Sequence, residues 1–313
     1  MQRAQARSCI IRCDSREFSR FADLLRARIE SLGANTDDGR VVLHIGRPEH
    51  WLSVADKINI GCSWWPHSAP NDYRALYRID RLIVPSAWCA QIAMPRPDQQ
   101  IHVLPAGIDT RVFAPELNAR PRGRLRFLAI AENADDPAAG IDLAGRAFLG
   151  ADIDASLDIF GYAPTGVSFT DRRIQTRRFI GAEIDLAKLF YGYDALLYPA
   201  RGDGAGIMAL KALACGTPVL HSGQTGMAEF ADLGELIASR KVTLHDGRHW
   251  HEPIIDLLVQ RIATFSLDRE KALADSRAAR ERFAIDAFAA RVLEVVHVAQ
   301  QSRNISERRG VSG

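Results

Sequence analysis

The stretch "GDGAGIMALKALACGTPVL", residues 202–220, begins with three spaced glycines and ends on a Cys-Gly-Thr-Pro turn before a β-type run. Spaced glycines let a backbone turn sharply and approach a ligand closely. The apolar run that follows them predicts a helix over 206–214, whose N-terminus would direct unpaired N–H groups and the positive end of its dipole into the loop. The stretch therefore favours an anionic or hydroxyl-rich ligand, although glycine-rich turns between strand and helix also occur for packing alone.

Composition narrows the class of protein. A chain of 313 residues is long for a single core, so one large or two medium domains are expected. The 40 basic and 38 acidic residues leave a net charge of +2, which argues against a nucleic-acid partner. Five scattered cysteines without a Cys-x-x-Cys pair predict neither disulfides nor a zinc site and favour a reducing, cytoplasmic setting. The apolar run near the N-terminus is too short for a signal peptide or a membrane span, and we expect neither.

Alternating β-type runs and amphipathic helical stretches predict an α/β fold of parallel sheets covered by helices. In the first half, strands are expected at 8–13, 40–46, 57–62, 81–86 and 101–107, and a helix at 15–32. Residues 113–124 contain two prolines, one glycine and three arginines, a composition typical of a linker. We therefore place a domain boundary after residue 112.

The alternation restarts after the linker. Strands are expected at 124–131, 156–161, 177–181, 195–199, 218–221 and 235–239, and helices near 141–149, at 184–191 and at 206–214. Residues 253–300 predict two or three helices, and the tail that follows predicts a frayed end. Two doubly wound domains in tandem would place a ligand in the cleft between the carboxyl ends of their strands.

The run from Pro199 to Val219 resembles the signature of the family-4 retaining glycosyltransferases of the GT-B fold. Residues 203–206 fall on the Glu-Gly-Phe-Gly block of that signature, and residues 211–219 fall on its Glu-Ala-x-Ala-x-Gly-x-Pro-Val block. Further segments that are similar to the family, in the expected order, are 58–73, 81–94, 101–116, 158–162, 178–199 and 223–230. The resemblance covers the chain from about residue 57 to 290.

The resemblance implies a GT-B fold, in which two Rossmann-like domains face a cleft. Residues 1–112 would form the acceptor-side domain and 113–285 the donor-side domain. Residues 286–313 would form a C-terminal helix that returns toward the first domain, followed by the frayed tail. The implied activity is metal-independent, retaining transfer of a hexose from a nucleotide-sugar donor to a glycan or lipid-linked saccharide in polysaccharide biosynthesis. The nucleotide sugar is a co-substrate and no cofactor is implied. A cytoplasmic protein with peripheral contact at the inner face of the membrane would suit such an acceptor.

The resemblance also assigns site residues. Asp203 and His67 are the expected catalytic residues, and Trp64 and Trp65 are expected to bind the acceptor. The expected donor-binding residues are Gly161, Gly181, Arg201, Gly204, Ala205, Gly206, Lys211, Gly226 and Glu229.

The expected donor site departs from the family at its charged positions. Glu132 and Ala139 stand where the family carries the Arg and Lys that stabilise the leaving diphosphate, and Lys211 stands where it carries the carboxylate that binds the ribose hydroxyls. Two interpretations follow. The enzyme is active, with Lys211, Arg201 or the pair 177–178 supplying the missing positive charge, or the chain is a degenerate scaffold that serves as a binding subunit. We favour the active transferase.

Several of these residues also have a plain structural interpretation. Lys211 would extend from a surface helix into solvent, Asp203 would hold its own turn, and Glu229 would cap the next helix. Two adjacent tryptophans point to opposite sides of a strand, so one of them would lie in the core. His67 would be an ordinary surface histidine. His245, His249 and His251 predict a solvated loop rather than a metal site.

Overall fold

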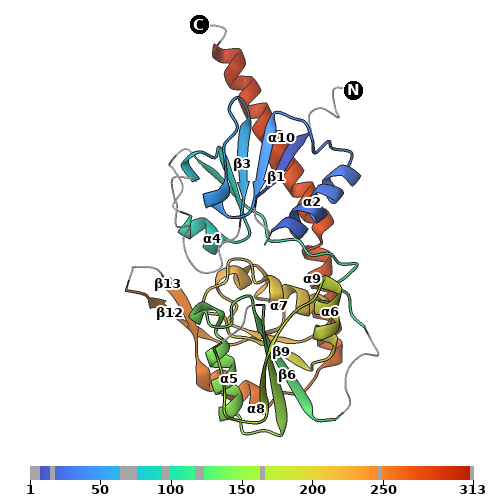
Figure 1. Cartoon of the computed structure of the whole chain (residues 1–313), viewed down its shortest axis with the longest axis vertical. Coiled ribbons are helices and arrows are strands. Elements are labelled where there is room, and N and C mark those ends of the chain that lie inside the picture. Colours follow the sequence, from blue (N-terminus) through green and yellow to red (C-terminus); the bar gives the residue numbers. More distant parts are fainter. Residues whose placement is uncertain are drawn as a thin grey trace. The chain divides into compact units, whose positions relative to one another are not determined.

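The computed structural model describes residues 8–14, 18–63, 76–93, 97, 99–116, 123–162, 166–245 and 249–310. The chain divides into two compact units, residues 1–107 together with 285–313 (unit 1) and residues 108–284 (unit 2). Each unit contains a parallel sheet with helices packed on it (Figure 1). The predicted α/β class is therefore confirmed.

Unit 1 has a five-stranded parallel sheet in the order β1-β2-β3-β4-β5. The strands are β1 (Cys9–Cys13), β2 (Val41–Ile45), β3 (Ile58–Cys62), β4 (Arg81–Val84) and β5 (Gln100–Val103). Its helices are α2 (Ser19–Ser31), α4 (Ala87–Ile92) and α10 (Ile285–Gly310), with a 3-10 turn η1 (Pro48–His50). Strands β2 and β3 are buried along their whole length, as expected of a parallel sheet covered on both faces.

Unit 2 has a six-stranded parallel sheet in the order β11-β10-β9-β6-β7-β8. The strands are β6 (Leu125–Ala131), β7 (Ala155–Gly161), β8 (Ile174–Arg178), β9 (Ala195–Tyr198), β10 (Val219–His221) and β11 (Glu235–Leu236). The helices are α5 (Ile141–Gly150), α6 (Glu183–Tyr191), α7 (Ile207–Ala214), α8 (Ile255–Ala263) and α9 (Arg269–Arg282), with 3-10 turns η2 (Pro137–Ala139) and η3 (Thr225–Phe230).

The side chains of β6 point alternately to the two faces of the sheet, and helices cover both faces. Leu128 packs in a core with side chains of α6, α7 and α9, whereas Phe127 packs in a second core with side chains of α5 and α8. Successive residues of a strand point to opposite faces, so one strand supplies both cores. The strand ends are thereby fixed between two helical layers.

The contacts place the border between the units earlier than residue 112. The Ile108 N–H donates to the Phe283 carbonyl at 2.8 Å, and Ile108 forms a parallel bridge with Ala284. Phe113 is fully buried in the core of unit 2. Residues 108–113 therefore belong to unit 2, and the chain re-enters unit 1 at Ile285.

Two further expectations were wrong in detail. The strand expected at 177–181 lies at 174–178, and the strand expected at 235–239 ends at Leu236. A separate antiparallel pair follows, β12 (Ser239–Thr243) and β13 (His249–Pro253), drawn as a two-stranded ribbon in Figure 1. His249 and His251 therefore lie on a strand rather than in the expected loop.

Gly140 is required where the loop after β6 meets the loop after β9. Its φ is +71°, and an added Cβ would lie 2.1 Å from the carbonyl oxygen of Pro199. We expect Gly140→Ala to lower the free energy of unfolding of unit 2 by about 3 kcal/mol, because it adds left-handed strain to a steric clash. Urea and thermal unfolding measure the loss.

Gly166→Ala is the matched control for that change. The nearest atoms to its added Cβ are the carboxylate oxygens of Asp135, at 3.9 Å. We expect its stability to stay within about 0.5 kcal/mol of wild type. Equal stabilities of the two variants would contradict the steric argument.

Candidate functional site

Three loops of unit 2 meet where β6, β9 and β10 end. The N–H groups of Arg201 and Gly202 donate to the Ala138 carbonyl at 2.8 and 3.2 Å, which joins the loop after β9 to the loop after β6. The Gly226 N–H donates to the Asp203 carbonyl at 2.7 Å, which joins the loop after β10 to the loop after β9. The carboxyl ends of neighbouring parallel strands share one edge of a sheet, and open α/β sheets bind ligands at that edge.

Asp203 holds the glycine loop in shape. Its Oδ1 accepts the N–H groups of Ala205 and Gly206 at 2.9 and 2.8 Å. Its Oδ2 accepts the Tyr198 hydroxyl at 2.5 Å. Burial, and then the neighbouring Asp203 charge, raise the pKa of Tyr198 well above its ordinary value, so the phenol stays a donor. The turn interpretation of Asp203 is confirmed, and its catalytic role stays a prediction.

Glycines allow the loops to approach at main-chain distance. Gly206 has φ +62°, and an added Cβ would lie 2.8 Å from Met227 and Phe230 side-chain atoms. A Cβ on Gly226 would lie 2.4 Å from the Gly204 carbonyl oxygen. The structure thus brings together the predicted residues Gly204, Gly206 and Gly226, with Ala205 between the first two. The close approach is thus a main-chain contact, and the Asp203 carboxylate accepts two of the loop N–H groups.

The other predicted residues lie at different places. Gly161 ends β7, and its carbonyl accepts the N–H of Phe179, two residues before Gly181. Glu229 lies in η3, where its carbonyl accepts a guanidinium hydrogen of Arg282 at 3.0 Å. Trp64, Trp65 and His67 lie outside the described residues, so their roles stay predictions.

Arg201 is almost fully buried and bound on all sides. Its guanidinium makes two hydrogen bonds of 2.7 and 2.8 Å to the Asp142 carboxylate and also pairs with both oxygens of Glu252. It donates further to the Pro137 carbonyl at 2.6 Å and lies 5.4 Å from the Trp250 ring centre. Two carboxylates balance its one charge. Arg201 therefore stands in this structure as a brace between α5, the loop after β9 and β13.

Lys211 is also paired. Its Nζ lies 2.8 Å from Glu183 Oε1 and 5.0 Å from the Phe113 ring centre, and 12% of its side chain is exposed. The interpretation that it extends into solvent is wrong. Glu183 is a residue that the sequence did not single out, although it lies two positions after Gly181 in the first turn of α6. Lys211 therefore brings a carboxylate to this end of the sheet.

The loop after β6 is acidic. Its charged residues are Glu132, Asp135 and Asp136, all acidic. Asp135 accepts the N–H groups of Gly166 and Val167 at 2.9–3.1 Å, and Asp136 caps η2 through the Ala138 N–H at 2.9 Å. Asp135 and Asp136 serve local structure, and the three carboxylates give this loop a negative charge.

Arg177 and Arg178 end β8, farther along the sheet. The Nε of Arg177 lies 3.7 Å from Asp158, and the Nε of Arg178 donates to the Tyr162 carbonyl at 3.2 Å. Both arginines are exposed. They remain candidates for holding an anion at the β8 end of the site.

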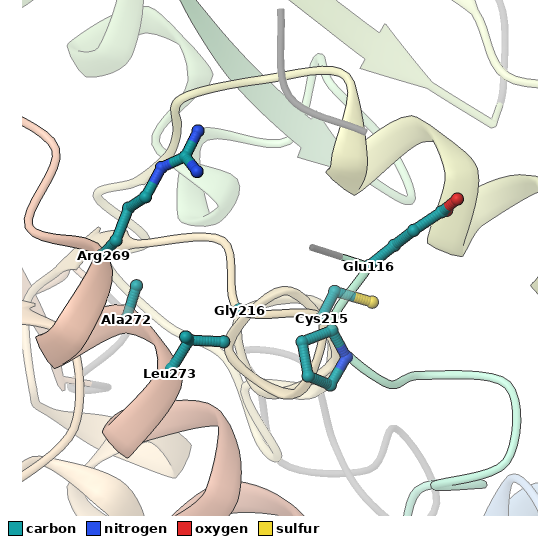
Figure 2. A pocket seen from close by; sticks show the side chains of 7 residues that line it. Glu116, Cys215, Gly216, Arg269, Ala272 and Leu273 are labelled. Atoms are coloured by element: carbon teal, nitrogen blue, oxygen red, sulfur yellow. The ribbon is translucent and has the colours of Figure 1, made fainter. Parts of the chain in front are cut away.

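A small pocket lies at the opposite end of α7 from the glycine loop (Figure 2). Figure 2 shows Glu116 and Arg269 at its sides, with Cys215 between them. The lining residues are Pro115, Glu116, Cys215, Gly216, Arg269, Ala272 and Leu273. The pocket holds none of the residues predicted to bind the donor or acceptor.

Among the described residues, no group of three or more His, Cys, Asp or Glu side chains is arranged to hold a metal ion. Within the same described part of the chain, no helix is long and apolar enough to cross a membrane.

Replacing Arg201 tests its bracing role. We expect Arg201→Met to lower the free energy of unfolding by about 2 kcal/mol, because Asp142 and Glu252 would face each other without their cation. Arg124→Met is the control, since Arg124 pairs with Asp154, 88% of whose side chain is exposed; a change below about 0.5 kcal/mol is expected there. Losses of equal size would contradict the brace.

Wild type and Arg201→Met should also differ in how their stability depends on pH. Burial tends to raise the pKa of Asp142, but the hydrogen bonds and charge of Arg201 outweigh it and hold the pKa below its ordinary value of 3.8. A lowered pKa contributes stability above the unfolded value, and that stability is lost as the pH falls through the folded value. The stability difference between wild type and Arg201→Met should therefore shrink below about pH 4. A difference that stays constant between pH 6 and pH 2.5 would contradict the assignment.

Comparison with solved structures shows the fold. The chain is similar to sucrose-phosphate synthase from Thermosynechococcus elongatus, with 16% identity, a TM-score of 0.63, and coverage of 86% of this chain and 74% of the other. It is similar to Alr3699/HepE from Anabaena, solved with UDP and glucose, with 12% identity, a TM-score of 0.60, and coverage of 89% and 82%. WaaG, a glycosyltransferase of lipopolysaccharide biosynthesis, gives 10% identity, a TM-score of 0.56, and coverage of 92% and 99%. The predicted GT-B fold is confirmed.

Sequence comparison shows the family. No match to the chain is found among curated protein sequences. The sequence model of the protein family described as "Family 4 Glycosyltransferase in conflict systems" matches residues 87–295. That range is more than half of the chain, and it contains every predicted donor-side residue. The resemblance seen in the signature run is thus confirmed, and the chain belongs to this glycosyltransferase family.

Proposed function

We propose that the protein transfers a hexose from a nucleotide-sugar donor to a saccharide acceptor with retention of configuration. The observation that supports this most is the meeting of three glycine-bearing loops around Asp203 at the carboxyl ends of β6, β9 and β10. HepE, a similar structure, was solved with UDP and glucose. A donor of that class would fit the same edge of the unit 2 sheet.

The glycine loop would hold the donor through its main chain. In our proposal the backbone of residues 204–206 approaches the sugar and diphosphate, and the first turn of α7 directs its unpaired N–H groups at the same place. Asp203 contributes by fixing that loop, since both of its oxygens already accept hydrogen bonds from the loop and from Tyr198. This part of the site would work through geometry rather than through side-chain charge.

Glu183 would replace the carboxylate that is missing at 211. Lys211 holds Glu183 Oε1, and the carboxylate is 43% exposed beside Gly181. A carboxylate accepts the paired hydroxyl hydrogens of a ribose, and a lysine cannot. We propose that Glu183 binds the ribose and that Lys211 positions it.

The proposal also covers the acceptor and the place of the reaction in the cell. We propose that the acceptor is a glycan or lipid-linked saccharide in polysaccharide biosynthesis, bound by Trp64, Trp65 and His67. Sugar rings stack on aromatic faces, and a histidine in reach of the acceptor hydroxyl would move its proton. The reaction would need no metal ion or other cofactor and would take place in the cytoplasm, with peripheral contact at the inner membrane face when the acceptor carries a lipid. WaaG, which is similar in fold, acts in lipopolysaccharide biosynthesis.

A donor panel tests the function. We expect one member of a set of UDP-, GDP-, ADP- and dTDP-hexoses to bind in calorimetry, and to be hydrolysed slowly to the free nucleotide without an acceptor. Asp203→Ala should weaken that binding at least about tenfold, whereas Asp203→Asn should retain most of it, because its amide oxygen still accepts the loop N–H groups. Absence of binding across the panel would contradict the proposed transferase activity and favour the degenerate scaffold that serves as a binding subunit.

A ribose comparison tests Glu183. Wild type should bind UDP, or the nucleotide that the panel identifies, about tenfold more tightly than its 2′,3′-dideoxy form. We expect Glu183→Gln to remove most of that preference and Lys211→Met to reduce it, because the carboxylate loses its anchor. Glu270→Gln, on the exposed side of α9, should keep it. A preference that survives Glu183→Gln would exclude Glu183 from the ribose site.

A further inference from the structure

The ribbon formed by β12 and β13 has two chemically different faces. In the antiparallel register, Lys241 lies opposite His251 and Thr243 opposite His249, while Val242 lies opposite Trp250. Directly opposed residues of a pair share a face, and successive residues alternate. The first face therefore carries Lys241, His249 and His251, and the second carries Trp250 and Glu252.

The second face fixes the ribbon to the side chain of Arg201. Glu252 pairs with the guanidinium of Arg201, and the Trp250 ring lies 5.4 Å from it. The His251 N–H donates to the Arg201 carbonyl at 2.8 Å, so the main chain of β13 lies directly against the loop that continues into Asp203. The one carboxylate among the described residues of the ribbon is therefore turned away from the first face and held by a cation.

Negative charge outweighs positive charge in the loops after β6 and β9. The loop after β6 carries Glu132, Asp135 and Asp136, and the charge of Arg201 is balanced by Asp142 and Glu252. A diphosphate needs positive charge or N–H donors within hydrogen-bond reach. The first face of the ribbon offers one lysine and two histidines, and the main chain of β13 is hydrogen-bonded to Arg201, the residue before the glycine loop.

We propose that Lys241 and His251, with His249 beside them, form an anion-binding face that contacts the diphosphate of the donor at the glycine loop. The inference rests on the proposed function, and it goes beyond it by assigning the positive charge of the donor site to a ribbon that follows the last strand of the sheet. Arg240 is outside this face, because it alternates with Lys241 and lies opposite Glu252.

His251 makes the binding depend on pH. Burial, then the charge of Lys241, then His249 hold the pKa of His251 below its ordinary value of 6.5. Lys241 faces it from β12 and His249 lies on its own strand, while the loop after β9 meets it through the Arg201 carbonyl. An anion that gains a hydrogen bond from the protonated imidazole is bound together with a proton. Affinity should therefore rise as the pH falls from 8 toward 5.5.

Titration of the full chain with UDP-glucose and with inorganic diphosphate tests the proposal; if the panel identifies another donor, that nucleotide sugar replaces UDP-glucose. A nucleotide sugar is suited to the pH series because both of its phosphates are esterified, so its charge is constant over this range. We expect Lys241→Met to weaken binding about tenfold at pH 6, and His251→Gln to abolish the rise in affinity between pH 8 and pH 6. Arg240→Met removes the same charge one residue away and should change affinity less than about twofold.

The outcomes separate this proposal from the proposed function. Nucleotide-sugar binding that is unchanged in Lys241→Met and His251→Gln overturns the ribbon and leaves the transferase standing. Diphosphate binding that depends on Lys241, with no nucleotide sugar bound, supports the ribbon and overturns the proposed donor. Equal losses of affinity in Lys241→Met and Arg240→Met would mean that only the general positive charge matters, which overturns the proposed anion-binding face. A wild type that binds neither ligand also overturns it.

Discussion

The guanidinium of Arg201 is the contact on which the arrangement of unit 2 loops depends. It joins the N-terminus of α5 through Asp142, the ribbon through Glu252, and the loop after β6 through the Pro137 carbonyl. A planar guanidinium with five donors can satisfy several acceptors in fixed directions, which an ammonium group cannot do. Because the same residue lies two positions before Asp203, the glycine loop starts from a fixed point.

This use of Arg201 changes how charge is distributed at the site. The proposed donor carries a diphosphate, yet the arginine beside the loop is already neutralised and the preceding loop is acidic. Lys211 is likewise paired, with Glu183. The charged groups thus differ in place from the family signature: a carboxylate stands on α6, and the ribbon carries a lysine and two histidines on one face. The glycines, which fix main-chain positions, stay where the family signature has them.

The sequence was sufficient for most of the fold, because the elements have clear local patterns. Most of the parallel strands lie within a few residues of their expected positions, since each apolar run is bounded by Gly, Pro or a charged turn. The ribbon was missed because "HWHE" alternates polar residues with one tryptophan and shows no apolar face. Its face is set by Arg201, which lies 51 residues away from Glu252 in the chain. The partner of Lys211 was missed for the same reason, as Glu183 is 28 residues distant. Long-range ion pairs leave no periodicity in a sequence.

The return of the chain at Ile285 also has a consequence for synthesis. Unit 1 is discontinuous: its sheet is complete by residue 103, but α10 is made only after unit 2. Residues Phe288, Val292 and Val296 of α10 fill the core beside α2. Unit 2 is continuous from 108 to 284, so every strand and helix that it needs leaves the ribosome before α10 does. A chain interrupted after residue 284 would therefore carry a complete unit 2 and a unit 1 whose apolar surface is uncovered. Helix α10 therefore completes unit 1 only after unit 2 has been made, and its loss would expose the core of unit 1 rather than that of unit 2.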